Sequence, residues 1–332
     1  MNSYGKNFRI TLFGESHGPF IGVVIDGITP GIELSEEDFS LDLQRRKKGD
    51  FPDLENGVTA RQEEDIPIFA SGLLNGVTTG APLAILFENR HQNPADYSSF
   101  KSHPRPSRED FAASSKFNGF NDIRGGGMFS GRMTVAIVAA GVVAKKTLQH
   151  SGLDIKFKAD LSSIAEEKDP CRWKDIICSA KAEGDSVGGS VQCQAEGVPA
   201  GKGAPFFDSL ESQIAHLAFS IPGVKGIRFG DPASSLKGSE FNDAIIDKNG
   251  TTATNHSGGI NGGISNGNPI VFTLDIRPAA SIAKPQKTFN FETGTVEELR
   301  IGGRHDACIA LRIPVIAEAI AAIVIADNCT TA

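Results

Sequence analysis

The sequence predicts a single α/β domain, residues 1–332, with buried helices at its centre. Two segments, 133–148 and 313–326, are apolar on nearly every side, which is typical of helices surrounded by other parts of a protein. Strand-like segments are interleaved with these helices, without the regular alternation of a doubly wound sheet. A chain of 332 residues is long enough for one large domain or two ordinary ones, and no linker divides this chain.

The first third of the chain predicts strands around one helix. Residues 8–13 and 21–25 have strand patterns on either side of a polar loop, and 65–88 holds two further strands around a turn. Ser35 is placed to cap a helix that has acids in its first turn and cations followed by glycine at its end. The polar stretch 89–124 predicts a long loop, and loops of that length in compact domains are usually functional or disordered.

The composition argues against several classes of protein. Apolar residues make up 39% and charged residues 22%, unlike a disordered chain, and the net charge of −7 disfavours nucleic-acid binding. The apolar segment 313–326 is shorter than the roughly 20 residues of a membrane span, and no secretory leader opens the chain. The five cysteines, an odd count without a CxxC pair, fit free thiols rather than disulfides or a zinc site. We therefore expect a cytoplasmic protein with no metal and no nucleic-acid or membrane partner.

The sequence GESHG at 14–18 is the first candidate for chemistry. Flanking glycines allow a short polar loop to approach a ligand, and a histidine there can exchange a proton near neutral pH. A plain turn carrying a hydrogen-bonded surface histidine fits the same residues equally well. The spacing does not match the GxSxG nucleophile elbow, so a serine hydrolase is disfavoured.

A second candidate is the glycine-rich stretch 124–132, RGGGMFSGR, which precedes the first buried helix. Free backbone N–H groups at a helix N-terminus, flanked by arginines, can hold an anion. The alternative is a tight turn before a core helix, and the pattern matches neither GxGxxG nor a P-loop. Arginines beside glycine, proline or helix ends recur along the chain and could build one positive cleft; they are Arg45, Arg46, Arg105, Arg108, Arg124, Arg132, Arg277, Arg304 and Arg312.

Several motifs, in order and over nearly the whole chain, resemble those of the chorismate synthase family. They are FGESHG at 13–18, DLQRRKKG at 42–49, GVTTGAP at 76–82, RGGG at 124–127, AAGVVAKK at 139–146, EGDSVGG at 183–189, GVPAGKG at 197–203, TNHSGGINGGISNG at 254–267 and GRHDAC at 303–308. The resemblance implies a β-α-β sandwich with central helices between antiparallel sheets, assembled as a homotetramer. It also implies the elimination of phosphate from 5-enolpyruvylshikimate 3-phosphate to give chorismate, with reduced FMN as cofactor. Whether NADPH serves as an indirect reductant of the flavin stays open.

The resemblance also implies roles for individual residues. His17 resembles the histidine that protonates reduced flavin, and Ser16 with Asp306 resembles the pair that serves flavin N5. Residues that resemble substrate or phosphate ligands are Arg45, Arg46, Arg105, Arg108 and Arg132. Residues that resemble FMN contacts are Met128, Phe129, Ser130, Asn255, Gly262, Arg277, Pro278, Ala279, Ala280, Ser281 and Arg304.

Some positions depart from the family pattern. Arg108 stands where the family usually has a second catalytic histidine, and arginine cannot donate a proton near neutrality, although it can neutralise phosphate. Met128 replaces a basic residue or histidine, and the loop 277–281 lacks a hydroxyl that the family usually carries. An arginine that often contributes to the substrate pocket is replaced within 50–53.

Three functions are therefore compared. An active chorismate synthase is favoured because most of the motif residues are intact. A degenerate paralogue that binds FMN or phosphate ligands with little turnover is suggested by Arg108 and Met128. A generic anion-binding protein would bind phosphate without regard to flavin, and the motif match along the whole chain disfavours it.

Overall fold

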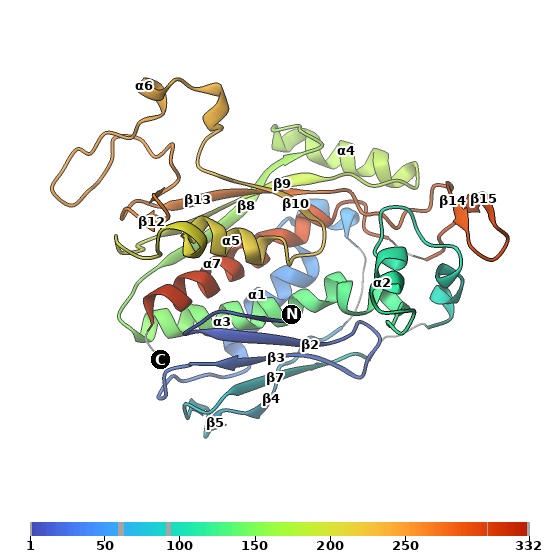
Figure 1. Cartoon of the computed structure of the whole chain (residues 1–332), viewed down its shortest axis with the longest axis horizontal. Helices are drawn as coiled ribbons and strands as arrows, with labels where there is room; N and C mark the ends of the chain where they lie inside the picture. The colour runs from blue at the N-terminus through green and yellow to red at the C-terminus, as the bar shows by residue number, and fades with distance from the viewer. Residues whose placement is uncertain (1, 59–62, 91–93, 304, 331–332) are drawn as a thin grey trace.

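The computed structural model describes residues 2–58, 63–90, 94–303 and 305–330. Two antiparallel sheets enclose a layer of helices, with α1, α3 and α7 between them (Figure 1). The predicted sandwich with central helices is confirmed. One apolar cluster extends through the helix layer to both sheets, from Phe8 to Ala326.

The first sheet is built from the N-terminal strands. Its order is β1 (Ser3–Tyr4), β2 (Arg9–Gly14), β3 (Phe20–Asp26), β7 (Leu83–Glu88) and β4 (Ile68–Ser71). In β3, Ile21, Val23 and Ile25 alternate toward the helices and are fully buried, as a strand with one face on the core requires. Because Gly14 pairs with Ile21, the GESHG loop lies at one end of the β2–β3 hairpin.

The second sheet covers the other side of the helices. Its order is β10 (Val224–Phe229), β13 (Ile270–Ile276), β9 (Gly189–Glu196) and β8 (Lys156–Ile164), all antiparallel. The remaining short strands form hairpins outside the two sheets: β5 (Leu73–Leu74) with β6 (Val77–Thr78), β11 (Ile260–Asn261) with β12 (Ile264–Ser265), and β14 (Gln286–Asn290) with β15 (Thr295–Leu299).

The helix layer is formed by the two segments predicted to be buried all round. They are α3 (Thr134–His150) and α7 (Ile313–Cys329), and α1 (Glu37–Lys48) packs beside them. The two long helices cross closely at Gly141, where an added Cβ would lie 2.4 Å from the Cβ of Ala319. Glycine is therefore required at that crossing by packing, despite its cost in a helix.

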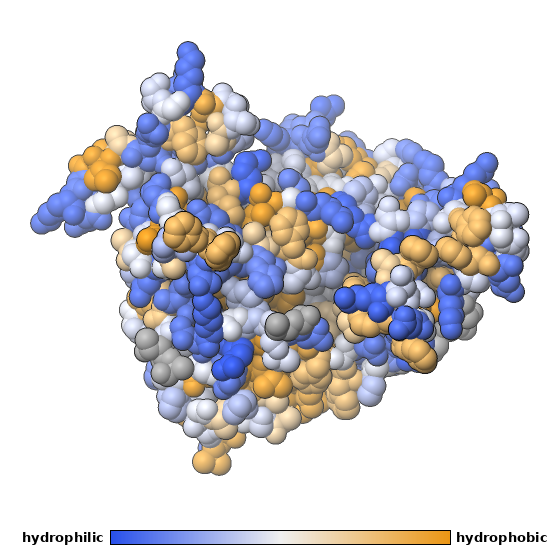
Figure 2. Space-filling view, in the orientation of Figure 1, coloured by the Kyte–Doolittle hydropathy of each residue, from blue (hydrophilic) through white to orange (hydrophobic). Residues whose placement is uncertain are grey.

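Shorter helices surround this core. They are α2 (Asp110–Lys116), α4 (Pro170–Ala182), α5 (Leu210–Ala218) and α6 (Gly238–Phe241), with 3₁₀ turns η1 (Pro52–Gly57), η2 (Pro94–Lys101), η3 (Arg124–Phe129), η4 (Gly131–Met133), η5 (Phe206–Asp208), η6 (Ala233–Ser235) and η7 (Ile309–Arg312). Apolar side chains gather on the visible surface over α2 and the β14–β15 hairpin, where Phe111, Phe289 and Phe291 are exposed (Figure 2).

Two local predictions are wrong. Ser35 does not cap α1: the N-cap is Glu36, and the carboxylate of Asp38 accepts the Ser35 N–H at 2.8 Å. The stretch 89–124 contains η2 and α2 rather than a continuous loop. Helices this short show too few turns for an apolar period to be visible in the sequence.

One helix among the described residues, Ile309–Cys329, is long and apolar enough to cross a membrane. Its most apolar window is 89% buried inside the protein, so it is the core helix of the sandwich. It extends beyond the predicted apolar run 313–326 because η7 leads directly into α7.

Candidate active site

The GESHG loop packs against the glycine-rich stretch. The Ser16 N–H donates to the carbonyl oxygen of Gly127 at 3.1 Å. Both Ser16 and His17 are buried, at 6% and 5% exposure, so His17 is not a surface histidine in a plain turn. Gly14 has φ +98°, and a Cβ there would lie 2.3 Å from the Phe20 carbonyl oxygen, so the turn into the loop needs glycine.

The three consecutive glycines have left-handed backbones, with φ of +59°, +85° and +52° at Gly125, Gly126 and Gly127. A Cβ on Gly125 would lie 2.4 Å from His17 Nδ1, and one on Gly126 would lie 2.6 Å from Arg108 Nη2. Six residues, the last three of them in η4, separate Gly127 from α3, so the glycines do not form the N-terminal turn of the long helix. They instead let the backbone pass between His17 and Arg108.

We expect Gly125→Ala to lower kcat at least tenfold and the free energy of unfolding by about 1–3 kcal/mol, because alanine is strained at this left-handed backbone and its methyl group displaces His17. Activity assays and chemical denaturation measure the two effects. The matched control is Gly152→Ala, since Gly152 has φ +78° but no atom within 4 Å of the place that a methyl group would take. Equal losses of activity in both variants would contradict the role assigned to the contact with His17.

Arg46 and Arg132 share one buried carboxylate. Arg46 Nη2 donates to Asp65 Oδ2 at 2.6 Å, and Arg132 Nη1 donates to the other oxygen, Oδ1. All three side chains are nearly inaccessible to solvent. Burial opposes ionisation of Asp65, but the two arginines outweigh it and lower the pKa of this carboxyl. Two guanidinium groups against one carboxylate leave a net positive centre beside the GESHG loop.

Arg105 and Arg108 form a second cationic group. Arg105 is held by Asp110 through Nε at 2.8 Å and Nη2 at 2.7 Å, and its Nη1 donates to Ser281 Oγ at 3.3 Å. Arg108 Nη2 donates to Glu109 at 2.7 Å. Burial lowers the pKa of Arg108, and the neighbouring charges of Arg105 and Arg277 lower it further. The loop 277–281 therefore lies beside these arginines.

Aromatic rings connect the two groups. The His17 ring lies edge-on to Tyr97 at 5.2 Å between centroids, and Tyr97 lies edge-on to Phe100 at 6.1 Å. The guanidinium of Arg105 stands 4.4 Å from the centre of the Phe100 ring. The histidine and both arginine groups thus border one region at the end of the β2–β3 hairpin.

Other predicted residues lie around this region. Ser130 caps η4, Phe129 packs on Phe117, and Met128 is exposed. Asp306 pairs with Arg312 at 3.4 Å. Burial lowers the pKa of Arg46, and the charges of Arg132 and Arg312 lower it further, so Arg312 lies near Arg46. The predicted FMN contact at Arg304 lies outside the described residues.

Arg45 faces away from its neighbour Arg46. It donates to Asp50 and to Glu318, each through two nitrogens at 2.8 Å, and to Asp42 at 3.4 Å. Lys145 joins the same carboxylates. Arg45 is thus engaged by acids between α1, α3 and α7, apart from the cluster of Arg46 and Arg132.

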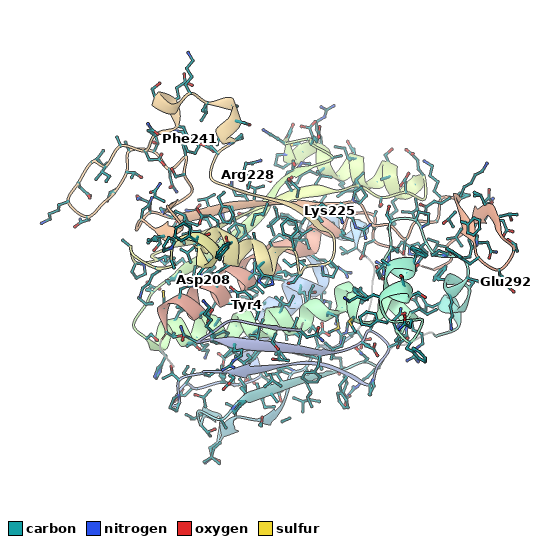
Figure 3. The ribbon with its side chains drawn as sticks, viewed as in Figure 1. Tyr4, Asp208, Lys225, Arg228, Phe241 and Glu292 are labelled. Atoms are coloured by element: carbon teal, nitrogen blue, oxygen red, sulfur yellow. The ribbon has the colours of Figure 1, made fainter. Side chains whose placement is uncertain are left out.

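Asn255 and Gly262 lie at the other end of the second sheet. The Asn255 amide donates to the carbonyl oxygen of Pro269, which precedes β13, whereas the loop 277–281 follows β13. Seven extended residues span about 20 Å. Figure 3 shows this separation: Phe241 marks the α6 side of the molecule and Glu292 the β14–β15 hairpin on the opposite side.

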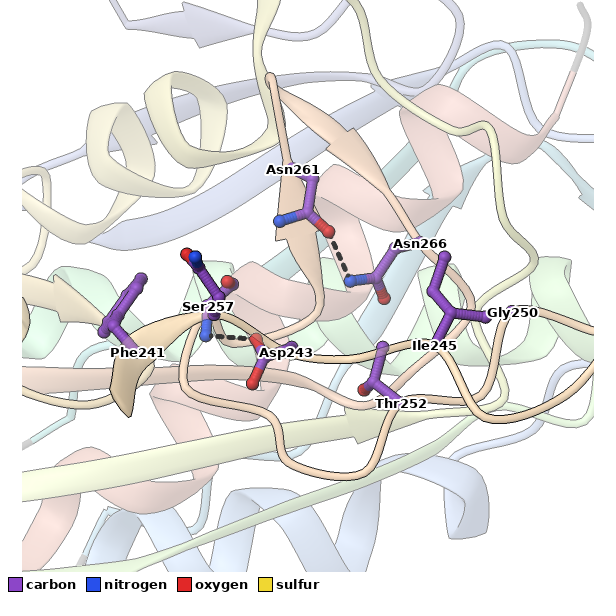
Figure 4. Close-up of a pocket in the computed structure, with 9 residues that line it drawn as sticks. Phe241, Asp243, Ile245, Gly250, Thr252, Ser257, Asn261 and Asn266 are labelled. Carbon is purple, nitrogen blue, oxygen red and sulfur yellow. Dashed lines mark hydrogen bonds between the residues drawn. The ribbon is translucent and has the colours of Figure 1, made fainter. Parts of the chain in front are cut away.

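A polar pocket of about 530 Å³ lies beside Asn255 and Gly262 (Figure 4). Asp243 organises it by accepting the Ser257 N–H at 2.9 Å, and Asn266 donates to Asn261 at 2.7 Å. Burial raises the pKa of Asp243, but hydrogen bonds from Thr254, Ser257 and His256 outweigh it and lower this pKa to about 2. Within one chain, the structure does not bring this pocket to His17.

Sequence reasoning missed two residues of the site, Asp65 and Asn89. Asn89 hydrogen-bonds both the GESHG loop and Arg132, and Asp65 joins the two arginines. Neither belongs to a glycine cluster or an arginine motif. The one signal in the sequence is that each residue lies next to a predicted strand: Asp65 comes shortly before β4, and Asn89 directly follows β7.

The fold and the site define a class of protein: an α/β sandwich with a central helix layer that buries a histidine beside several arginines, suited to a multiply charged anion. The sequence model of the chorismate synthase family matches residues 8–330. A chorismate synthase of Chitinophaga pinensis is 52% identical over 98% of this chain and 96% of its own length. Those of Opitutus terrae and Thermococcus gammatolerans are 40% and 39% identical at the same coverage. The chain belongs to the chorismate synthase family, which consists of carbon–oxygen lyases.

A solved structure described as chorismate synthase agrees in fold. It superposes with a TM-score of 0.72 over 98% of this chain and 92% of its own length, at 24% identity. The identity of 52% to a curated relative supports the active enzyme rather than the degenerate paralogue.

Proposed function

We propose that this protein eliminates phosphate from 5-enolpyruvylshikimate 3-phosphate to give chorismate, using reduced FMN. The observation that carries the proposal is the burial of Ser16 and His17 beside the paired arginines Arg46 and Arg132 in a member of this family. The substrate carries a phosphate and two carboxylates, and buried guanidinium groups are the strongest protein ligands for such anions.

Polar groups of the site could bind either the phosphate or the ring of a flavin. Ser16 Oγ and Arg108 Nε are buried and have no hydrogen-bond partner among the residues that the structure describes. Gly125 lets the side chains of Ser16 and His17 lie directly against the backbone, because a Cβ there would come within 2.6 Å of Ser16 Oγ and 2.4 Å of His17 Nδ1. Residues that would hold the cofactor are Met128, Phe129, Ser130, Arg277, Pro278, Ala279, Ala280 and Ser281, with Arg304. Asn255 and Gly262 lie at the other end of the second sheet, so they would reach the same cofactor only from a second copy of the chain. When bound, reduced FMN supplies an electron that assists departure of phosphate.

The chain's own residues bind, orient and exchange protons. Arg46, Arg105, Arg108 and Arg132 neutralise the substrate anion in a region from which water is largely excluded, where electrostatic stabilisation is strongest. His17 is placed to pass a proton to the cofactor, because its ring is fixed between Gly125 and Tyr97. Ser16 and Asp306 complete the proposed proton-handling groups, and Arg45 supports α1.

Anaerobic turnover tests the proposal. Purified protein, photoreduced FMN and 5-enolpyruvylshikimate 3-phosphate are mixed, and chorismate and phosphate are followed together. We expect both products in a one-to-one ratio. Binding of flavin and substrate without product would indicate the degenerate paralogue, and phosphate binding that is indifferent to flavin would indicate an anion-binding protein.

Arg108 gives a sharper test of how phosphate leaves. We expect Arg108→Ala to lower kcat/KM about 100-fold, and Arg108→His not to raise kcat, because the buried guanidinium acts through its charge with Arg105 and Arg277. Steady-state assays measure both, with Arg300→Ala as the control, since Arg300 pairs with Glu298 on the exposed hairpin. A rise in kcat for Arg108→His would show instead that a missing general acid limits the rate.

We further propose a single-domain, cytoplasmic homotetramer, with NADPH as an indirect reductant of its flavin. Exposed aromatic side chains support assembly, since Phe206 and Phe207 are 84% and 94% exposed. The five free cysteines support a reducing compartment, and the continuous apolar cluster supports one domain. Light scattering at several concentrations measures the assembly, and a monomer would contradict it.

A further inference from the structure

One asparagine joins the histidine loop to the arginine pair. Asn89 is the first residue after β7, and the pairing of Phe20 with Glu88 places it opposite Pro19, at the end of the GESHG loop. Its backbone N–H donates to the Pro19 carbonyl oxygen at 3.1 Å. The sheet register therefore brings a side chain from a distant part of the sequence onto the loop that carries His17.

The side-chain amide of Asn89 closes this loop. Its Nδ2 donates to the carbonyl oxygens of Glu15 at 3.1 Å and Gly18 at 2.8 Å, which are the residues on either side of Ser16 and His17. The Gly18 N–H donates back to Glu15 at 3.0 Å, so the turn is closed from within as well. The backbone that carries His17 is thus held at both of its ends by one amide group.

The oxygen of the same amide meets the arginine pair. Asn89 Oδ1 accepts from Arg132 Nε at 3.0 Å, while Arg132 donates through its other nitrogens to Asp65 and to the Glu88 carbonyl oxygen. Two carbonyls on one side and a guanidinium on the other fix which way the amide points. Only a group with both N–H donors and an oxygen acceptor serves both sides, and an aspartate in its place would lose both donors.

We propose that Asn89 is a positioning residue that fixes the His17 loop relative to Arg132, so that the proton-handling group and the anion-binding group keep one mutual geometry. The proposal rests on the proposed function for the roles of His17 and Arg132. Residues that orient catalytic groups through hydrogen bonds commonly contribute about 10- to 100-fold in activity.

The test compares Asn89→Asp with Asn249→Asp in the full-length protein. Both variants exchange an amide for a carboxylate, and Asn249 lies on an exposed turn far from the loop. We expect Asn89→Asp to lower kcat about 10- to 100-fold and to shift the pH dependence of kcat. The KM for substrate should change less than threefold, and Asn249→Asp should match the wild type. A change confined to KM or to thermal stability would overturn the proposal.

A double-mutant cycle identifies the group through which Asn89 acts. In a His17→Ala background, Asn89→Asp should cost less than about threefold, because the side chain it positions is gone. A loss as large as in the wild-type background would overturn the proposal.

A readout without turnover separates this proposal from the proposed function. The ring resonance of His17, assigned by its loss in His17→Ala, should shift in Asn89→Asp but not in Asn249→Asp. If the wild type forms no chorismate while this shift is seen, the proposed reaction fails and the positioning role stands. An unchanged His17 resonance overturns the positioning role whatever the activity.

Discussion

Replacing Asp65 with asparagine lowers the free energy of unfolding by about 3 kcal/mol, because two buried guanidinium groups lose the carboxylate they share. The side-chain amide can accept from one arginine, but its NH₂ group then faces the other. Asparagine also tolerates the left-handed backbone of residue 65, whose φ is +56°. Asp65→Ala should lose about 1 kcal/mol more, since alanine adds strain at that φ. Urea unfolding measures both values.

The matched control is Asp26→Asn. Asp26 pairs with Arg9 at 3.2 Å on the surface, and exposed pairs contribute at most about 1 kcal/mol. If Asp65→Asn were no more destabilising than Asp26→Asn, the carboxylate would not be neutralising the two arginines, and their charge would have to be balanced elsewhere.

The same carboxylate gives the protein an acid-sensitive contribution to stability. Burial raises the pKa of Asp65, but Arg46 and Arg132 outweigh this and hold it below its usual value. A carboxyl whose pKa is lowered on folding adds stability above its unfolded value, about 3.9, and loses it as the pH falls through the lower folded value. The unfolding free energy of Asp65→Asn should therefore fall less steeply than that of the wild type below pH 4.

The helix layer was predictable because the apolar residues of its two long helices are visible in the sequence without any knowledge of tertiary contacts. The segments 133–148 and 313–326 are apolar on every side, and no other arrangement in water accommodates such helices. The short helix α2 was not predictable, since its seven residues form only two turns. Its position depends on tertiary contacts such as the stacking of Phe111 on Phe291, whose ring centroids lie 5.5 Å apart.

The site was predictable in part. Motifs mark Ser16, His17 and the glycines, but they do not distinguish Arg45 from Arg46. Successive residues on a helix point about 100° apart, so one arginine meets Glu318 in the helix layer and the other meets Asp65 at the site. Asn89 lay outside every motif because its role arises only when β3 and β7 pair.

His17→Ala should lower kcat about 10²- to 10⁴-fold, the range expected when a positioned proton-transfer group is removed. The KM for 5-enolpyruvylshikimate 3-phosphate should change less than about threefold, because the arginines that we assign to the substrate stay paired with Asp65. His150→Ala is the control, since His150 lies exposed at the end of α3. Steady-state assays over pH 5.5–8.5, about one to two units either side of the ordinary histidine pKa, measure both parameters.

The pH profile decides between two ways in which His17 could matter. If the imidazole exchanges a proton, kcat of the wild type changes with pH within the range of these assays, and His17→Ala and His17→Asn both lose that limb of the pH profile. If the ring only fills the space between Gly125 and Tyr97, asparagine should restore most of the activity with the limb unchanged. Because a Cβ on Gly125 would lie 2.4 Å from this ring, the loop and the glycines hold the imidazole in one place, as positioned proton transfer requires. We therefore expect both variants to lose the limb.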